Sequence, residues 1–194
     1  PMTTTSNGSP LAPDARRVVV LGHPGHELAI YGLLQRHPPD AIVVVTDGGA
    51  SQRVRESEEG LRRIGLLERA TYLDFPEGRF YDALLDGDVA FVRTAADAVR
   101  SAVGPLAPTH VLCDAVEFYN PLHDITLPIV RVALHGGAAA VYEIPLVYEV
   151  AGHEGAFAVQ RVPATMRDRC LAFALTEAEL QATVVARNAV YRSL

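Results

Sequence analysis

The chain has 194 residues, of which 49% are hydrophobic and 21% charged, and its formal net charge is −6 at pH 7. This length predicts one domain, the negative charge excludes the basic surface that a nucleic-acid partner requires, and no apolar stretch approaches the roughly 18 residues of a membrane span. The basic residues are all arginine, which excludes a P-loop lysine and a lysine Schiff base.

The first residues of the chain differ in composition from the rest. Residues 1–15 are rich in Thr, Ser, Gly and Pro, and we expect them to form a disordered lead before a single folded domain at residues 16–194. No signal peptide is visible, so the expected location is the cytoplasm. Cys113 and Cys170 are too few for a disulfide framework or a four-thiolate zinc site.

Strand-like and helix-like segments alternate along the chain. The predicted strands are residues 17–21, 41–46, 70–74, 109–113, 139–143, 146–150 and 156–162. The predicted helices are residues 27–36, 53–64, 89–103, 125–135 and 177–191, the fourth with Pro128 in its first turn. This alternation predicts a single-domain, Rossmann-like three-layer α/β sandwich with a mostly parallel sheet, whose strands follow the order 3-2-1-4-5.

Histidines follow two of these strands. His23 and His26 come directly after the first strand, and His123 comes after the fourth. In the predicted order these two strands are neighbours, so we expect the loops that follow them to converge. Three protein ligands with one open position are typical of catalytic zinc, although other divalent transition metals also suit three imidazoles. Histidines at such turns can instead serve only as hydrogen-bond partners of the backbone.

The other histidines have weaker positions for binding a ligand. We expect them to be structural or exposed, because a lone histidine is weak support for a site. They are His37, His110, His135 and His153. A nucleotide-binding turn is disfavoured after the first strand, since Pro24 stiffens it and removes an amide donor.

Four short segments of the chain are informative when they are taken together in chain order. They are Gly22-His23-Pro24-Gly25-His26-Glu27, Thr46-Asp47-Gly48, Arg53 with Glu56 before Ile64-Gly65, and Asn120-Pro121-Leu122-His123. In this order they resemble motifs of the PIG-L/LmbE-type zinc-dependent N-deacetylases, a family that removes acetyl groups from substrates containing N-acetylglucosamine. The resemblance implies a zinc ion held by His23, His26 and His123, with His26 where the family has an aspartate ligand.

The departures from the family pattern concern proton transfer. Gly25 stands where the family has the aspartate that usually acts as general base. Asn120 and Leu122 stand where the family has a histidine and an aspartate. Asn120 can donate a hydrogen bond to a developing oxyanion, but it cannot act as an acid.

With glycine at that position, a general base would have to come from another carboxylate near the predicted site. We predict Glu117 as the first choice, because it shares a loop with His123 between apolar neighbours, and Asp114 as the second. The alternative is that Asp114 and Glu117 only orient the imidazoles that bind the metal.

These observations predict a metal-dependent amide hydrolase that acts on a small molecule, namely an N-acetylated sugar or a related polar metabolite. The alternative is a metal-binding pseudoenzyme, or a metalloenzyme with a different reaction on the same scaffold. The apolar segment at residues 144–148 is either part of the core or the interface of a homo-oligomer.

Overall fold

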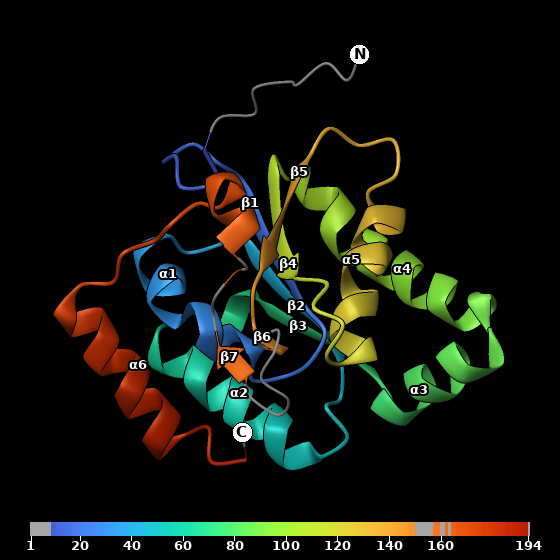
Figure 1. Cartoon of the computed structure of the whole chain (residues 1–194), viewed down its shortest axis with the longest axis horizontal. Coiled ribbons are helices and arrows are strands. Elements are labelled where there is room, and N and C mark those ends of the chain that lie inside the picture. The colour runs from blue at the N-terminus through green and yellow to red at the C-terminus, as the bar shows by residue number, and fades with distance from the viewer. Residues whose placement is uncertain (1–8, 150–156, 160–161, 163, 194) are drawn as a thin grey trace.

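The computed structural model describes residues 9–149, 157–159, 162 and 164–193. A five-stranded sheet with the order β3-β2-β1-β4-β5 forms its centre, and all of its neighbouring strands are parallel (Figure 1). Both the predicted order and the predicted fold class are confirmed. The strands are β1 (Arg17–Leu21), β2 (Ala41–Thr46), β3 (Ala70–Phe75), β4 (His110–Asp114) and β5 (Ala140–Ile144).

Helices cover both faces of the sheet (Figure 1). One face carries α1 (Tyr31–Arg36) and α2 (Ser51–Arg63), and α6 (Glu177–Ala189) packs on α1. The other face carries α3 (Glu77–Asp86), α4 (Val89–Val103) and α5 (Pro121–Ala133). Short 3-10 helices connect these elements: η1 (His26–Ile30), η2 (Leu67–Arg69), η3 (Gly104–Leu106) and η4 (Ala164–Arg169).

The central strand β1 is buried on both faces. Val18 and Val20 pack into the core formed with α3, α4 and α5, whereas Val19 and Leu21 pack into the core formed with α1 and α2. Successive side chains of a strand point to opposite faces, so a run of apolar residues suits a strand that helices cover on both sides.

The end of β1 lies beside the end of β4. Arg17 to Val20 of β1 pair in parallel with residues of β4, which brings the residues after β1 next to Asp114. The Gly22 amide donates a 2.7 Å hydrogen bond to Asp114 Oδ2. A Cβ at Gly22 would lie 2.7 Å from Thr126 Oγ1 and 2.9 Å from Asp114 Oδ2, so glycine permits this close approach.

Two α-helices differ most from the sequence prediction, and the first half of the helix predicted at residues 27–36 is the 3-10 helix η1. Helix α3 was not predicted, although Gly87 ends it with a φ of 68° and Phe80 and Ala83 share its buried side. Helix α5 begins at Pro121 rather than at residue 125, because the Asn120 side chain caps it by accepting from the Leu122 amide. Pro128 consequently lies inside the helix rather than in its first turn.

The ends of the chain are only partly described. Residues 1–8 of the predicted disordered lead and His153 lie outside the described residues, and residues 9–15 form turns.

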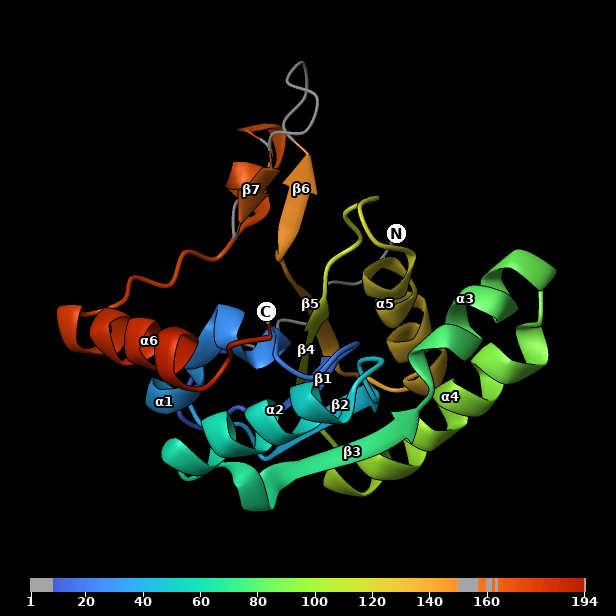
Figure 2. The same cartoon turned by 90° about the horizontal axis from the view of Figure 1, so that it is seen from below.

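Late in the chain, β6 (Val147–Glu149) and β7 (Phe157–Val159) form an antiparallel pair that projects from the main sheet (Figure 2). Among the described helices, none has the combination of length and apolar character needed to cross a membrane.

Candidate metal centre

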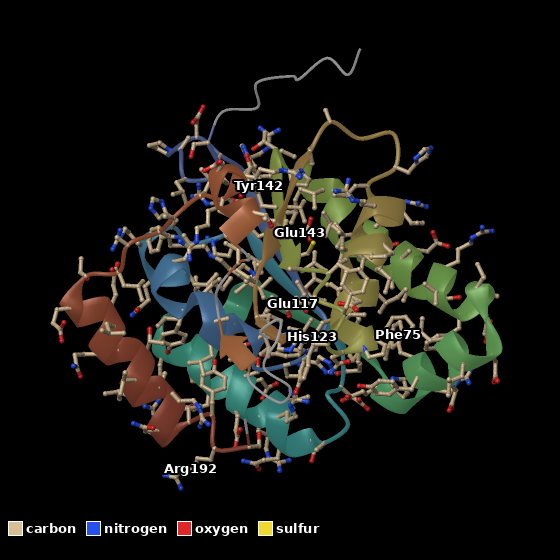
Figure 3. All side chains as sticks on the ribbon, in the orientation of Figure 1. Phe75, Glu117, His123, Tyr142, Glu143 and Arg192 are labelled. Carbon is tan, nitrogen blue, oxygen red and sulfur yellow. The ribbon has the colours of Figure 1, made fainter. Side chains whose placement is uncertain are left out.

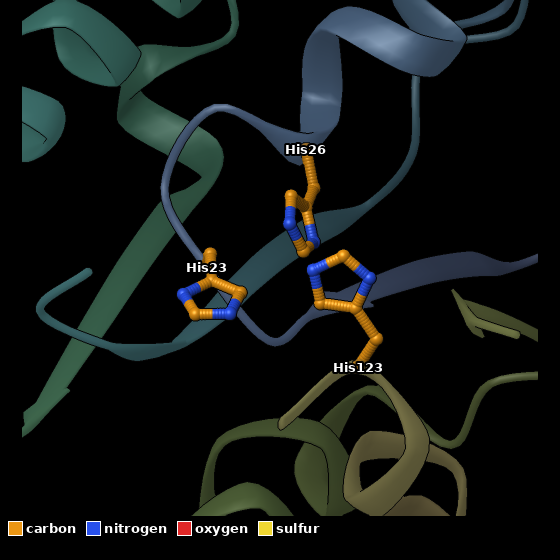
Figure 4. Close-up of side chains that lie close together, drawn as sticks. All are labelled: His23, His26 and His123. Carbon is orange, nitrogen blue, oxygen red and sulfur yellow. The ribbon is translucent and has the colours of Figure 1, made fainter. Parts of the chain in front are cut away.

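Three histidine rings meet at the carboxyl edge of the sheet and point toward one another (Figure 4). They belong to His23 after β1, His26 at the start of η1, and His123 in the first turn of α5. One nitrogen from each ring lies within 4.8 Å of the other two, and the ring centroids are 4.6 to 5.3 Å apart. The structure thus brings together the three residues that the sequence predicts as ligands.

A tight turn presents the first two rings to the same point. Gly25 has a φ of 101°, in the left-handed region that favours glycine, and the His26 amide donates to the His23 carbonyl at 3.4 Å. The Leu28 amide then donates to the Gly25 carbonyl as η1 begins. Gly25, which stands where the motif that this segment resembles has an aspartate, therefore shapes the turn between two candidate ligands.

A carboxylate faces the Nδ1 atom of each ring. Asp114 Oδ2 lies 2.8 Å from His26 Nδ1. Glu77 Oε2 lies 3.6 Å from His23 Nδ1, and Glu117 Oε2 lies 3.7 Å from His123 Nδ1. A histidine that binds a metal commonly has its second nitrogen directed at a carboxylate, which sets the orientation of the ring. This arrangement leaves the Nε2 atoms as the candidate ligand atoms.

The donor set fits a divalent cation. His23 is 1% exposed, and its Nε2 atom is buried with no hydrogen-bond partner in the described part of the chain. Burial, followed by the nearby His26, Arg53 and His123, lowers the pKa of His23 to about 2. A neutral imidazole is the form that binds a metal, so a buried ring held neutral with an unsatisfied nitrogen is suited to a cation.

Asp114 is completely buried behind the histidines. Its Oδ2 atom accepts hydrogen bonds from the Gly22 amide and from His26, at 2.7 and 2.8 Å. These contacts fix the orientation of the His26 ring, so they favour the orienting role over that of a general base.

Glu117 lies next to His123, as the view of all side chains shows (Figure 3). Its Oε1 atom accepts from the amides of Leu146 and Val147 at 2.5 and 2.9 Å, and its side chain is 5% exposed. Amide donors thus hold this carboxylate in place, and its Oε2 atom lies near His123 Nδ1, which has no hydrogen-bond partner in the described part of the chain. That Glu117 acts as a base stays a prediction.

Asn120 has a structural contact besides any catalytic one. Its Oδ1 atom caps α5 by accepting from the Leu122 amide at 2.9 Å and also accepts from the Tyr81 hydroxyl at 3.2 Å. The carboxamide nitrogen of the same side chain is the group that an oxyanion donor would use. Its role as that donor stays a prediction.

Two residues near the three histidines were not predicted from the sequence. Both lie on α3, a helix that was not predicted either. They are Glu77, which faces His23, and Tyr81, whose hydroxyl bridges Glu77 Oε1 and Asn120 Oδ1 at 3.3 and 3.2 Å. Burial and the neighbouring Glu77 raise the Tyr81 pKa, so its hydroxyl remains a donor. The signal that could have found them is the helical spacing of Phe80 and Ala83 after Pro76.

The remaining motif residues do not form one group and have different contacts in the structure. Arg53 lies near the centre, with its Nη1 atom 3.9 Å from Glu77 Oε2. Glu56 accepts hydrogen bonds from Gln52 and Ser193. Asp47 accepts from the amides of Gly49 and Glu77, which is a turn role.

The architecture and the cluster together define a class: a Rossmann-like α/β protein with a candidate divalent metal site at the carboxyl edge of its sheet. No family model matches the sequence, and no curated protein matches it.

Solved structures of deacetylases share the fold. The zinc-inhibited form of teicoplanin deacetylase Orf2 superposes with a TM-score of 0.63 at 14% identity, over 89% of this chain and 82% of that chain. A deacetylase–teicoplanin complex from the biosynthesis pathway of teicoplanin gives 0.62 at 16% identity, over 89% and 85%. The A40926 pseudoaglycone deacetylase Dbv21 gives 0.58 at 13% identity, over 90% and 80%. The chain therefore shares its fold with these deacetylases.

Proposed function

We propose that the protein is a metal-dependent amide hydrolase of the PIG-L/LmbE type, acting on an N-acetylated sugar or a related polar metabolite. The observation that carries this proposal is the convergence of three buried histidines on a deacetylase fold. The substrate class comes from the resemblance of the motifs and from the deacetylase structures that share the fold.

In this proposal zinc is the metal, and His23, His26 and His123 hold it. A divalent cation in such a site lowers the pKa of water and polarises a carbonyl group. The residues of the chain supply the geometry: Asp114 orients His26, Glu77 faces His23, and Glu117 faces His123. Three neutral ligands leave the full charge of the cation at the site, which suits the stabilisation of negative charge.

The proposed general base is chosen between two carboxylates, Glu117 and Asp114. Glu117 is a better candidate than Asp114, because Asp114 is completely buried and already bonded to His26, whereas Glu117 retains slight exposure at the edge of the site. Glu117→Gln separates its two possible roles. A base is indicated by a large loss of kcat with unchanged metal affinity, and an orienting residue by weakened metal affinity.

The proposed function is tested by release of free amine from a panel of N-acetylated sugars incubated with zinc-loaded protein. We expect turnover by the native chain and none by His123→Ala, since that change removes a ligand. Folding of the variant is checked by circular dichroism. Lack of turnover on every N-acetylated substrate, in a protein that holds zinc, would contradict hydrolysis.

Two observations favour a second candidate, a metal-binding protein without hydrolytic activity. Gly25 occupies the position of the usual base, and the carboxylates described above face the Nδ1 atoms of the rings. In that case the protein would bind one metal per chain through the same three histidines, but would release no amine.

A further inference from the structure

A buried carboxylate connects the turn between the histidines to the end of the chain. We call residues 23–26 the metal loop. Glu27 directly follows it and is 0% exposed. Its Oε2 atom accepts from the Gly25 amide, and its Oε1 atom accepts from the Tyr191 hydroxyl, both at 2.9 Å. One side chain thus contacts both the metal loop and a residue 164 positions later.

The energetics of burial make both hydrogen bonds important. A carboxylate that leaves water loses hydration, and charge-assisted hydrogen bonds offset that loss. If the Tyr191 hydroxyl were removed, Glu27 would have to find another donor. The side chain and the Gly25 amide would then shift together, because they share the second hydrogen bond.

The position of the Tyr191 hydroxyl is itself closely fixed. Tyr191 is 0% exposed, and a Cβ at Gly60 of α2 would lie 1.8 Å from its hydroxyl oxygen. The ring also meets Tyr31 edge to face, with centroids 6.5 Å apart. Burial and the charge of Glu27 raise the Tyr191 pKa, so the hydroxyl acts as a donor throughout the physiological range.

A second carboxylate holds the same end of the chain in place. Glu56 Oε2 accepts from the Ser193 amide at 3.0 Å and from its hydroxyl at 2.5 Å. Burial pushes the Glu56 pKa upward, but the hydrogen bonds from Ser193 and Gln52 outweigh it and leave the pKa below its ordinary value. The segment after α6 is therefore held by hydrogen bonds at Tyr191 and again at Ser193.

We infer that Tyr191 is a positioning residue of the metal centre, which acts through Glu27 on the Gly25 turn that presents His23 and His26. This inference rests on the metal site of the proposed function and is independent of hydrolysis. The segment after α6 would then contribute to metal affinity as well as to the stability of the fold.

The test compares two Tyr→Phe variants, each of which loses one buried hydroxyl group. Tyr191→Phe removes the donor to Glu27, whereas Tyr31→Phe removes a neighbouring buried hydroxyl that donates to the Gly60 carbonyl at 2.9 Å. Zinc affinity is measured by competition with a chromogenic chelator, and stability by urea unfolding of the metal-free protein. We expect Tyr191→Phe to weaken zinc binding roughly tenfold, as for other residues that support ligands, and Tyr31→Phe to leave it unchanged.

Glu27→Gln provides a second variant should Tyr191→Phe fail to fold. It keeps the size of the side chain but replaces one acceptor oxygen with an amide donor, so we expect weaker zinc binding here too. Unchanged affinity in the folded variants, or equal weakening in Tyr31→Phe, would overturn the inference. A native chain that binds zinc but releases no amine would contradict only the proposed hydrolysis, and one that binds no zinc would contradict both.

Discussion

At the scale of single residues, the candidate site depends on pairs rather than on isolated ligands. Each histidine ring has one nitrogen directed toward the cluster and the other toward a carboxylate, and the shortest such pair is His26 with Asp114. The partners Asp114, Glu77 and Glu117 come from different elements. The orientation of the rings is therefore a property of the folded chain and not of the histidine motif alone.

Replacing Asp114 with asparagine tests this pairing. Asparagine has nearly the same size, but its oxygen is uncharged and accepts more weakly than the carboxylate Oδ2 that serves both the Gly22 amide and His26. We expect zinc affinity to fall by about 10- to 100-fold, the usual effect of removing a group that orients a histidine ligand. The affinity is measured by chelator competition, and an unchanged affinity would show that the pair does not orient His26.

Gly22 allows the close approach on which that pair depends. An alanine Cβ here would lie 2.7 Å from Thr126 Oγ1 and 2.9 Å from Asp114 Oδ2, in a fully packed region. We expect Gly22→Ala to lower the free energy of unfolding by about 1–3 kcal/mol, the usual cost of overpacking. Urea unfolding measures this loss. Gly78→Ala, where a Cβ would meet nothing within 4 Å, is the control that should not show such overpacking.

At the scale of elements, an ion pair between Arg36 and Glu179 links helix α6 to α1. Glu179 accepts from Arg36 and also closes a capping box with Thr176. The hydrogen bonds from Arg36 and then from Thr176 lower the Glu179 pKa from 4.5 to about 2. A carboxyl group whose pKa is lower in the fold than in the unfolded chain stabilises the fold above the unfolded value.

This linkage predicts a particular dependence on pH. The stability advantage of the native chain over Glu179→Gln should be complete above pH 4.5 and should decline as the pH falls toward about 2. The urea midpoint of both proteins across that range measures the effect. Glu68→Gln, at an exposed position, is the control for removing a carboxylate outside this ion pair. A constant difference between native chain and Glu179→Gln would contradict the role assigned to the ion pair.

Several elements could be predicted from the sequence for physical reasons. The apolar, β-branched residues of β1 indicate a strand covered on both faces, and parallel strands align their carboxyl ends, which is why the meeting of His23 and His123 was foreseeable. The start of α5 was not, because it depends on an Asn120 cap. Glu77 was missed with α3, and the contact of Tyr191 with Glu27 follows from packing between distant segments.

At the scale of the whole molecule, the fold brings the last described residues of the chain against the segment that follows the first strand. The metal loop follows the first strand, and the last described residues return to support it. The fold is that of deacetylases, while the candidate ligand set is three neutral histidines. The central claim is that this set binds one divalent metal ion per chain.

Elemental analysis of the native chain and of His123→Ala, each purified without added metal or chelator and then after incubation with zinc, tests that claim most directly. We predict about one zinc ion per native chain and none in folded His123→Ala. A native chain that holds no metal even after incubation with zinc, or a variant that retains a full equivalent, would contradict the claim.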